Sequence, residues 1–414
     1  RLPVDSLEAR DAMVLRLWGE VGVEGVVIEE TSPEEPLGDE ERVRSPPPDN
    51  REWAANRFNQ AVELYRKHNP APAEGAARQP IRIGVIERNL DFDTPDFADY
   101  LGDCRASWPR LCVYARDAED PSGHGTAVTG VLAAVWGKGG NSGFLRGLEG
   151  SGPGFEVIVD RNSNGGLSAN IAATVNLVRD GARIINWSWG IHRVGATDID
   201  GEEVASLTRS GEAMRGYRVL FERFLNWLER EHPDVVIVNS AGNASFFAGR
   251  SDYRLPSSFF HEQLIVVGGH EVSDRDVSRS DPGHVARRSA SSLGMRVDIS
   301  AAACMRATSL EPDERGERRC GTSFSTPLVG GLLAAMLSVD DSLSPAQLRE
   351  ILRRSALTIG DPVHFGSADE HHLTAPILPS ERPGDPAHPD IGRSARLNMY
   401  GALRLVLDAA EQHH

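Results

Sequence analysis

Three short stretches of the sequence carry side chains that could do chemistry. The stretch "CGTSFSTP" at 320–327 puts Ser323 at the start of an apolar helix, where unpaired N–H groups and the helix dipole favour developing negative charge. The stretch "GHGTAVTG" at 123–130 puts His124 ahead of a helix rich in small residues, which allows close contact with neighbouring elements. The stretch "VVIVNSAGN" at 235–243 ends a predicted strand near Asn243, whose amide could donate to a reacting oxygen.

Each of these residues, taken alone, also has a structural interpretation. Ser323 could cap its helix, His124 could serve only packing, and Asn243 could be a turn residue. A fourth residue, Glu87, comes directly after the β-branched run "IRIGVI", which predicts a buried strand. In open α/β sheets, ligands gather at the carboxyl ends of the strands, and both Glu87 and Asn243 follow such ends.

The elements that must position these residues alternate along the chain from residue 81 onward. Predicted strands lie at 81–86, 155–160, 182–189, 234–241 and 263–269, and predicted helices at 124–136, 168–180, 212–231, 324–338 and 345–356. Surface loops are expected at 191–211, 271–288 and 357–392. This alternation of near-continuous apolar strands with helices predicts an α/β fold, in which a doubly wound, mostly parallel central sheet has helices on both faces.

Charge and composition narrow the class of partner. The 60 acidic residues outnumber the 44 basic ones, for a net charge of −16, which argues against nucleic acid as a partner. No apolar run reaches the length of a membrane span. Hydrophobic residues make up 40% of the chain, enough for a sizeable core.

The four cysteines form two local pairs, Cys104 with Cys112 and Cys304 with Cys320. Local pairing predicts two small disulfide-closed loops and an oxidising compartment, and the alternative is four reduced thiols. A metal site is less expected, because the sequence has no CxxC motif and no tight Cys/His cluster.

Taken together in chain order, Glu87, His124, Asn243 and Ser323 strongly resemble the site of the subtilisin-like serine proteases. The matched motifs are "GVIERNLDFDTPDF", "GHGTAVTG", "INWSWG", "VVIVNSAGN" and "GTSFSTP", and the resemblance spans residues 78 to 408. It implies a secreted or extracytoplasmic serine endopeptidase. Ser323 would attack the peptide carbonyl, His124 would accept its proton, and the Asn243 amide with the Ser323 N–H would hold the oxyanion.

The resemblance also implies where a peptide substrate binds. Two backbone segments should flank an extended peptide, namely Ser188, Trp189 and Gly190 on one side and Ser240, Ala241 and Gly242 on the other. Trp189 is bulky for its position, so it either narrows a subsite or packs inward. The bottom of the pocket for the residue before the scissile bond falls within "FFAGRSDYRLPSS" at 246–258, without a single residue standing out.

The sequence departs from the family pattern at the acid. Position 87 matches the family's aspartate but is glutamate here, and the usual glycine two residues on is Asn89. Three interpretations follow: Glu87 serves as the acid, Asp91 or Asp93 replaces it, or the triad is impaired and the protein is a weak or inactive peptide-binding pseudoprotease. A transpeptidase or macrocyclase, in which an amine replaces water, is a further alternative on the same fold.

Two further expectations concern the N-terminus and ions. Residues 1–75 are expected to be an N-terminal extension or prosegment remnant with an acidic Pro-rich linker, and residues 76–410 the catalytic domain. The extension is favoured, because no long αβ prodomain pattern appears, and helical spacing is visible at 51–68. No cofactor is expected. Calcium stays open because Asp96 matches a family ligand position, although the companion loop is not recognisable in "WGKGGNSGFLRG".

Overall fold

The computed structural model describes most of the chain from residue 51 onward. The described residues are 51–69, 79–87, 90–91, 94, 96–97, 111–116, 123–136, 142–161, 166–192, 207–243, 254–272, 285–288, 290–292, 296–306, 318–359 and 394–413.

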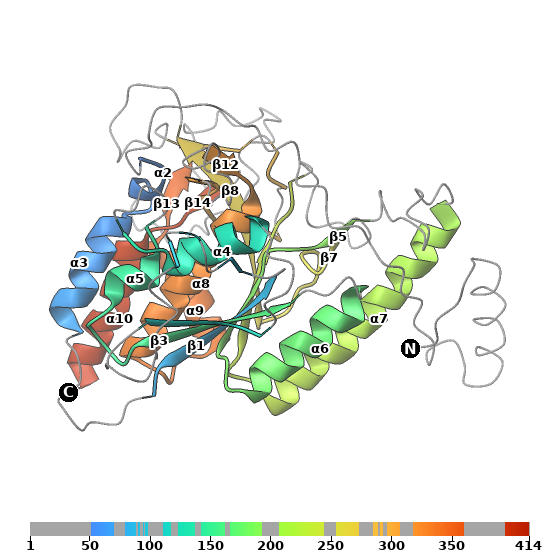
Figure 1. Cartoon of the computed structure of the whole chain (residues 1–414), viewed down its shortest axis with the longest axis horizontal. Coiled ribbons are helices and arrows are strands. Elements are labelled where there is room, and N and C mark those ends of the chain that lie inside the picture. The colour runs from blue at the N-terminus through green and yellow to red at the C-terminus, as the bar shows by residue number, and fades with distance from the viewer. Residues whose placement is uncertain are drawn as a thin grey trace, which may run out of the picture.

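A mostly parallel sheet forms the centre of the protein, as the sequence predicts (Figure 1). Its strands, in spatial order, are β13 (Leu357–Ile359), β14 (Ser394–Arg396), β10 (Ile299–Ala302), β8 (Leu264–Val272), β6 (Val236–Ser240), β4 (Ile184–Trp187), β1 (Ile81–Glu87), β3 (Phe155–Arg161) and β2 (Leu111–Ala115). All neighbours in this order are parallel except β13 with β14, and β9 (Val285–Arg287) pairs antiparallel with β8. The chain order reverses at β1, which lies between β3 and β4.

Helices cover both faces of this sheet (Figure 1). One face carries α4 (Gly123–Ala133), α5 (Phe144–Leu148), α8 (Thr322–Val339) and α10 (Met399–His413), with α9 (Pro345–Ser355) packed on α10. The other face carries α6 (Gly166–Arg179) and α7 (Leu207–Glu231). The doubly wound architecture is therefore the one expected from the sequence.

The five predicted strands and five predicted helices are all present, with ends shifted by up to a few residues. The sequence did not predict β2, β9, β10, β13, β14, α5 or α10. Strands such as "ISAA" of β10 and "SAR" of β14 are short and built from small residues, so they lack the β-branched signal of the central strands. All three loop predictions are wrong at one or both ends. The stretch 271–288 contains the end of β8 at Val272 and all of β9, which begins at Val285. The stretch 191–211 contains a short strand at Ile191–His192 and the start of α7 at Leu207, and 357–392 opens with β13.

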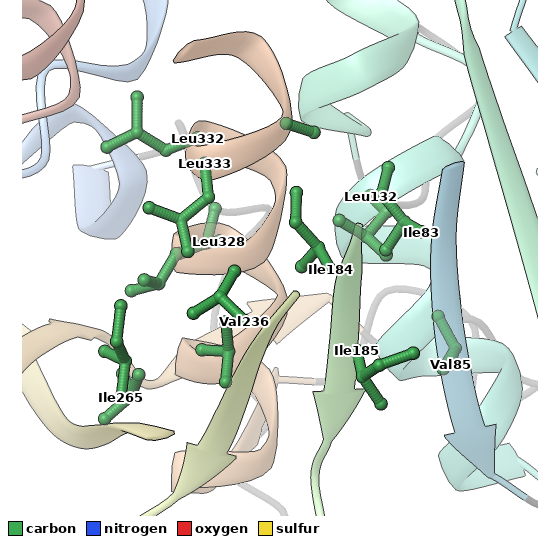
Figure 2. Packing of buried hydrophobic residues seen from close by; sticks show 14 of the residues in the cluster. Ile83, Val85, Leu132, Ile184, Ile185, Val236, Ile265, Leu328, Leu332 and Leu333 are labelled. Atoms are coloured by element: carbon green, nitrogen blue, oxygen red, sulfur yellow. The ribbon is translucent and has the colours of Figure 1, made fainter. Parts of the chain in front are cut away.

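The central core is built around α8, whose side chains pack on the strands of the central sheet (Figure 2). Leu328, Leu332 and Leu333 of α8 have no exposed surface, and they pack toward Ile184 and Ile265 of the sheet. Among the described helices, α8 is the one that is long and apolar enough to cross a membrane, yet 94% of it is buried inside the protein. Burial on all sides explains its uniformly apolar composition, as in other core helices.

The described part of the N-terminal region packs into this same core. Helices α2 (Arg51–Ala54) and α3 (Phe58–His68) precede β1, and α3 lies against α5 and α10. Phe58 and Tyr65 are almost fully buried, and the Tyr65 hydroxyl contacts that of Ser338 at 2.7 Å. The buried Asn56 donates to the carbonyl of Leu397 and accepts from the N–H of Ala302, both at 2.9 Å. The acidic Pro-rich linker expected within residues 1–75 lies outside the described residues, which begin at residue 51.

One of the two predicted disulfides is present. Cys304 and Cys320 are directly opposite each other on the antiparallel pair β11 (Cys304–Arg306) and β12 (Arg318–Cys320), and they are bonded. Cys112 is buried in β2, and its expected partner Cys104 lies outside the described residues. Cys320 lies three residues before Ser323, so the disulfide fixes the segment that leads into α8.

Candidate active site

The acid and the histidine meet at the carboxyl end of the sheet. Glu87 is the last residue of β1, and His124 is the second residue of α4. Both side chains are largely buried, with 7% and 15% exposed, and Nδ1 of His124 lies 2.9 Å from Oε2 of Glu87. Because a carboxylate only accepts hydrogen bonds, this contact places the proton on Nδ1 and leaves Nε2 as the basic nitrogen of the neutral ring.

Of the two alternative acids, only Asp91 lies within the described residues. Asp91 donates its backbone N–H to Oγ1 of Thr126 at 3.0 Å, and its carbonyl accepts from Thr94. The bond to Thr126 ties the chain after β1 to α4, two residues beyond His124. Asp93 lies outside the described residues, as does Asn89. The carboxylate seen against His124 Nδ1 is that of Glu87.

The candidate nucleophile lies at the beginning of α8, as predicted. Gly321 precedes the helix, its N–H donates to the carbonyl of Ala303 at 2.8 Å, and Ser323 is the second helical residue. The Ser323 hydroxyl donates to the carbonyl of Ser188 at 3.2 Å, and the Ser188 hydroxyl donates to the carbonyl of Ser323 at 2.7 Å. This reciprocal pair fixes the start of α8 against the end of β4.

Helix packing brings the histidine to the same place. α4 and α8 lie against each other, and the ring of His124 is 5.7 Å, between centroids, from the ring of Phe324, the residue that follows Ser323. Glu87, His124 and Ser323, which are far apart in the sequence, therefore occupy one region at the carboxyl ends of the central strands. This region adjoins the point where the chain order reverses, which is where α/β sheets commonly bind ligands.

The amide of Asn243 is held in a defined orientation beside the nucleophile. Its Oδ1 accepts from the backbone N–H of Thr322 at 2.9 Å and from the Thr322 hydroxyl at 3.1 Å. The Thr322 hydroxyl in turn accepts from the N–H of Gly242 at 3.1 Å. Because Oδ1 is engaged on the protein side, Nδ2 is the group that the amide can offer to a ligand next to Ser323. Thr322 lies inside the quoted motif, but its role was not predicted.

The two predicted substrate-binding segments lie side by side. β4 and β6 pair as far as Trp187 opposite Asn239, and residues 188–190 and 240–242 continue from there. The buried Asn239 donates from Nδ2 to the carbonyls of Trp187 and Trp189, both at 2.8 Å, and so spans the two segments. The N–H of Ala241 donates to the carbonyl of Val267 in β8 at 2.8 Å. Asn239 was not predicted as a site residue.

Trp189 packs inward, which is one of the two alternatives left open by the sequence. Its side chain is only 9% exposed. Its ring lies 5.0 Å from that of Trp187 and stacks at 6.3 Å on that of Phe221 in α7. The indole therefore belongs to an aromatic cluster beneath α7.

The expectations about ions stay predictions. Asp96 is 2% exposed, and its carbonyl accepts from the N–H of Val135 at 3.1 Å. Within the described residues, no group of three or more His, Cys, Asp or Glu side chains is arranged to hold a metal ion. Part of the stretch expected to supply further calcium ligands, 137–141, lies outside them.

Comparison with known proteins gives the family. The model of the subtilase family matches residues 79–402. Subtilisin E of Bacillus subtilis (strain 168) is 24% identical over 318 residues, covering 75% of this chain and 70% of its own length. Subtilisin DY of Bacillus licheniformis is 23% identical over 304 residues, covering 72% of this chain and 92% of its own length.

Solved structures of a cytotoxin and a protease share the fold of this chain. The subtilase cytotoxin SubAB aligns with a TM-score of 0.54 at 18% identity, over 87% of this chain and 97% of its own. A lanthipeptide protease aligns with a TM-score of 0.51 at 18% identity, over 92% of this chain and 99% of its own. By class the chain is a serine-type endopeptidase, and it belongs to the subtilase family.

Proposed function

We propose that this subtilase hydrolyses peptide bonds through a Ser323–His124–Glu87 triad with a glutamate as its acid. The observation that carries the proposal is the 2.9 Å contact between Nδ1 of His124 and Oε2 of Glu87, both largely buried. A carboxylate in this position holds the imidazole in one tautomer and stabilises the imidazolium that forms during the reaction. Family membership supports the serine nucleophile.

The proposed reaction proceeds by acyl transfer in two steps. In the first, the Ser323 hydroxyl leaves the Ser188 carbonyl, gives its proton to Nε2 of His124, and its oxygen bonds to the peptide carbonyl carbon. The tetrahedral intermediate collapses as His124 passes that proton to the leaving amine, which breaks the C–N bond. In the second step, water attacks the ester with His124 again as base, which releases the carboxylic acid and restores Ser323.

Two donors are proposed to hold the oxyanion of each tetrahedral intermediate. One is Nδ2 of Asn243, and the other is the backbone N–H of Ser323 in the first turn of α8. The double contact of Asn243 Oδ1 with Thr322 supports this role, because it fixes the amide before substrate binds. Fixed donors stabilise developing charge without reorganisation, and each is worth about 3 kcal/mol.

The substrate is proposed to be an extended peptide between the segments Ser188–Gly190 and Ser240–Gly242. The support is their position, since one segment contacts Ser323 and the other leads into Asn243. We further propose an extracytoplasmic site of action, because the Cys304–Cys320 bond would persist only in an oxidising compartment. The reaction as written uses no cofactor.

A fluorophosphonate probe tests the nucleophile directly. Wild type is expected to label covalently at Ser323, while Ser323→Ala and His124→Ala are not. Ser325→Ala is the matched control, because Ser325 lies two residues on in α8 and its hydroxyl bonds to the carbonyl of Ala301. Loss of labelling in Ser323→Ala with retention in Ser325→Ala supports the proposal, and wild type that does not label contradicts it.

Product masses separate hydrolysis from the alternatives. A hydrolase gives two fragments whose summed mass exceeds that of the substrate by one water. A macrocyclase gives a product one water lighter than the hydrolysed fragment, and a pseudoprotease gives no product while still binding peptide.

A further inference from the structure

A short antiparallel pair brings a distant arginine to the substrate-binding segments. After Gly190 the chain enters β5 (Ile191–His192), which pairs with β7 (Arg254–Leu255), so that His192 lies opposite Arg254. Arg254 is thus placed next to the segment 188–190, although 64 residues separate it from Gly190 in the sequence. The sequence placed the bottom of a substrate pocket within 246–258 without selecting a residue, and Arg254 lies in that stretch.

The guanidinium of Arg254 lies between two glycines, one from each segment. A Cβ atom on Gly190 would overlap the guanidinium group, with Nε 2.6 Å away. A Cβ atom on Gly242 would lie 2.7 Å from the same Nε and 2.8 Å from Cδ. Gly242 also has a positive φ of 101°, which a residue with a side chain rarely adopts. The two glycines therefore leave space for this one side chain between the segments.

Hydrogen bonds fix the plane of the guanidinium. Nη1 donates to the carbonyl of Ser240 at 2.5 Å and to the hydroxyl of Ser257 at 3.0 Å, and Nη2 donates to the hydroxyl of Ser240 at 3.0 Å. Arg254 is 3% exposed, and an arginine keeps its charge in such surroundings. The result is a positive charge with a fixed fork of N–H groups between the two segments.

This charge lies next to the reacting groups. Gly242 is followed by Asn243, the proposed oxyanion donor, and Ser188 exchanges two hydrogen bonds with Ser323. In the proposed function, the carbonyl held by Ser323 and Asn243 belongs to the residue before the scissile bond. Because the two segments flank that carbonyl, the side chain of this residue would enter the space between them, where Arg254 lies.

We propose that Arg254 selects an acidic side chain, aspartate or glutamate, at the residue before the scissile bond. Because Nη1 donates to Ser240 and Ser257, the carboxylate would meet the edge of the guanidinium that carries Nε and Nη2, the edge that lies against Gly190, in the paired, charge-assisted geometry that a guanidinium forms with a carboxylate. A charge at the base of a serine protease's substrate site sets which residue is cleaved. The inference rests on the proposed function and specifies its substrate class.

Peptides that differ at one residue test the inference. A series with Asp, Asn, Glu, Gln, Ala, Leu or Lys before the scissile bond is compared by kcat/KM, with cleavage positions read by mass spectrometry. The acid–amide pairs match in size, so they isolate charge. Wild type is expected to prefer Asp to Asn, or Glu to Gln, by about 100-fold.

Variants at the arginine give the second arm. Arg254→Gln is expected to reduce the preference for the Asp peptide over the Asn peptide from about 100-fold to near one, a ratio that is read within one variant. Arg254→Lys keeps the charge without the fork and should retain part of the preference. Arg349→Gln is the matched control: this arginine also donates to backbone carbonyls, those of His261 and Leu264, but away from the site, so the preference should persist.

The outcomes separate this inference from the proposed function. Equal cleavage of acid and amide peptides by a wild type that labels with fluorophosphonate overturns the inference alone. A preference for Ala over every larger residue also overturns it, since Arg254 would then act as a steric block. Wild type that neither labels nor cleaves overturns the proposed function and this inference with it. Should Arg254→Gln fail to label through misfolding, the wild-type and Arg254→Lys profiles decide the question.

Discussion

Thr322 holds Asn243 by two hydrogen bonds to the same oxygen, one from its backbone N–H and one from its hydroxyl, at 2.9 and 3.1 Å. The residue before the candidate nucleophile therefore sets the orientation of the candidate oxyanion donor. The same hydroxyl accepts from the N–H of Gly242, which links the β6 segment to the start of α8. The contacts of Thr322 thus position both the candidate nucleophile and the candidate oxyanion donor.

Removing the amide should affect the chemical step more than binding. For Asn243→Ala we expect kcat to fall about 10²- to 10³-fold with KM changed little, because the lost interaction forms with the oxyanion and not with the ground state. Steady-state kinetics on one peptide measure both constants. A rise in KM at unchanged kcat would place Asn243 in substrate binding instead.

Loosening the amide without removing it should give a smaller effect. Thr322→Val removes the hydroxyl bonds and keeps the backbone N–H bond to Asn243, so we expect kcat to fall about tenfold, the equivalent of one neutral hydrogen bond. Thr322→Ser is the control, since it keeps the hydroxyl and should remain close to wild type. If Val and Ser behave alike, the hydroxyl has no part in positioning the amide.

The sequence singled out the candidate site residues but not the residues that support them, for a physical reason. Glu87, His124, Asn243 and Ser323 each lie where a strand or loop meets a helix or turn, and such junctions have local signals of apolar runs, glycines and small residues. The supports depend on contacts between residues far apart in the chain, such as those of Asn239 with Trp187 and Trp189 across 50 and more positions. No local pattern encodes these contacts.

The same limit applies to the fold. The central strands were predicted because they are continuous and β-branched, whereas β10 and β14 are recognised only by their pairing, with Ser300 opposite Arg396. Trp189 shows the limit at a single residue. Its side chain could face the substrate or the core. The outcome depends on contact with Phe221 of α7, which lies 32 residues further along the chain.

The disulfide should stabilise the approach to the nucleophile. Its cysteines are 16 positions apart, and closing a loop of this length contributes about 3 kcal/mol in the chain-entropy model. Replacing both Cys304 and Cys320 by Ser should lower the free energy of unfolding by about that amount, as measured by urea denaturation. Unchanged stability on replacement would mean that the bond adds nothing to the native state over the unfolded one.

The helix α3 should be part of the same folding unit as the catalytic core. Phe58 is 1% exposed, and its ring lies 5.0 Å from that of Trp53 and 5.3 Å from that of Phe144. Phe58→Ala should cost about 3–5 kcal/mol of stability, as expected for deletion of a buried ring. Gln60→Ala, on the exposed side of the same helix, is the control and should change stability by less than about 0.5 kcal/mol. Similar stabilities of both variants would indicate that α3 docks without contributing to the core.

The use of glutamate as the acid can be tested by shortening the side chain at position 87. Glu87→Asp keeps the charge and shortens the side chain by one methylene, so its carboxylate should fall short of Nδ1 of His124, now 2.9 Å from Oε2. We expect a kcat between that of wild type and that of Glu87→Gln, measured with the same peptide. An aspartate variant as active as wild type would show that the strand end adjusts to either length.

The role of Glu87 as the triad acid is decided by comparing the kcat of Glu87→Gln with that of wild type on a single cleavable peptide, with unfolding followed by circular dichroism to verify the fold. Glutamine keeps the size of the side chain but not its charge, so it can neither enforce the Nδ1–H tautomer nor stabilise the imidazolium. We expect kcat to fall about 10⁴-fold in a folded protein. A folded Glu87→Gln variant with wild-type kcat would contradict this role, because the hydrogen bond between Glu87 and His124 would then have no part in catalysis.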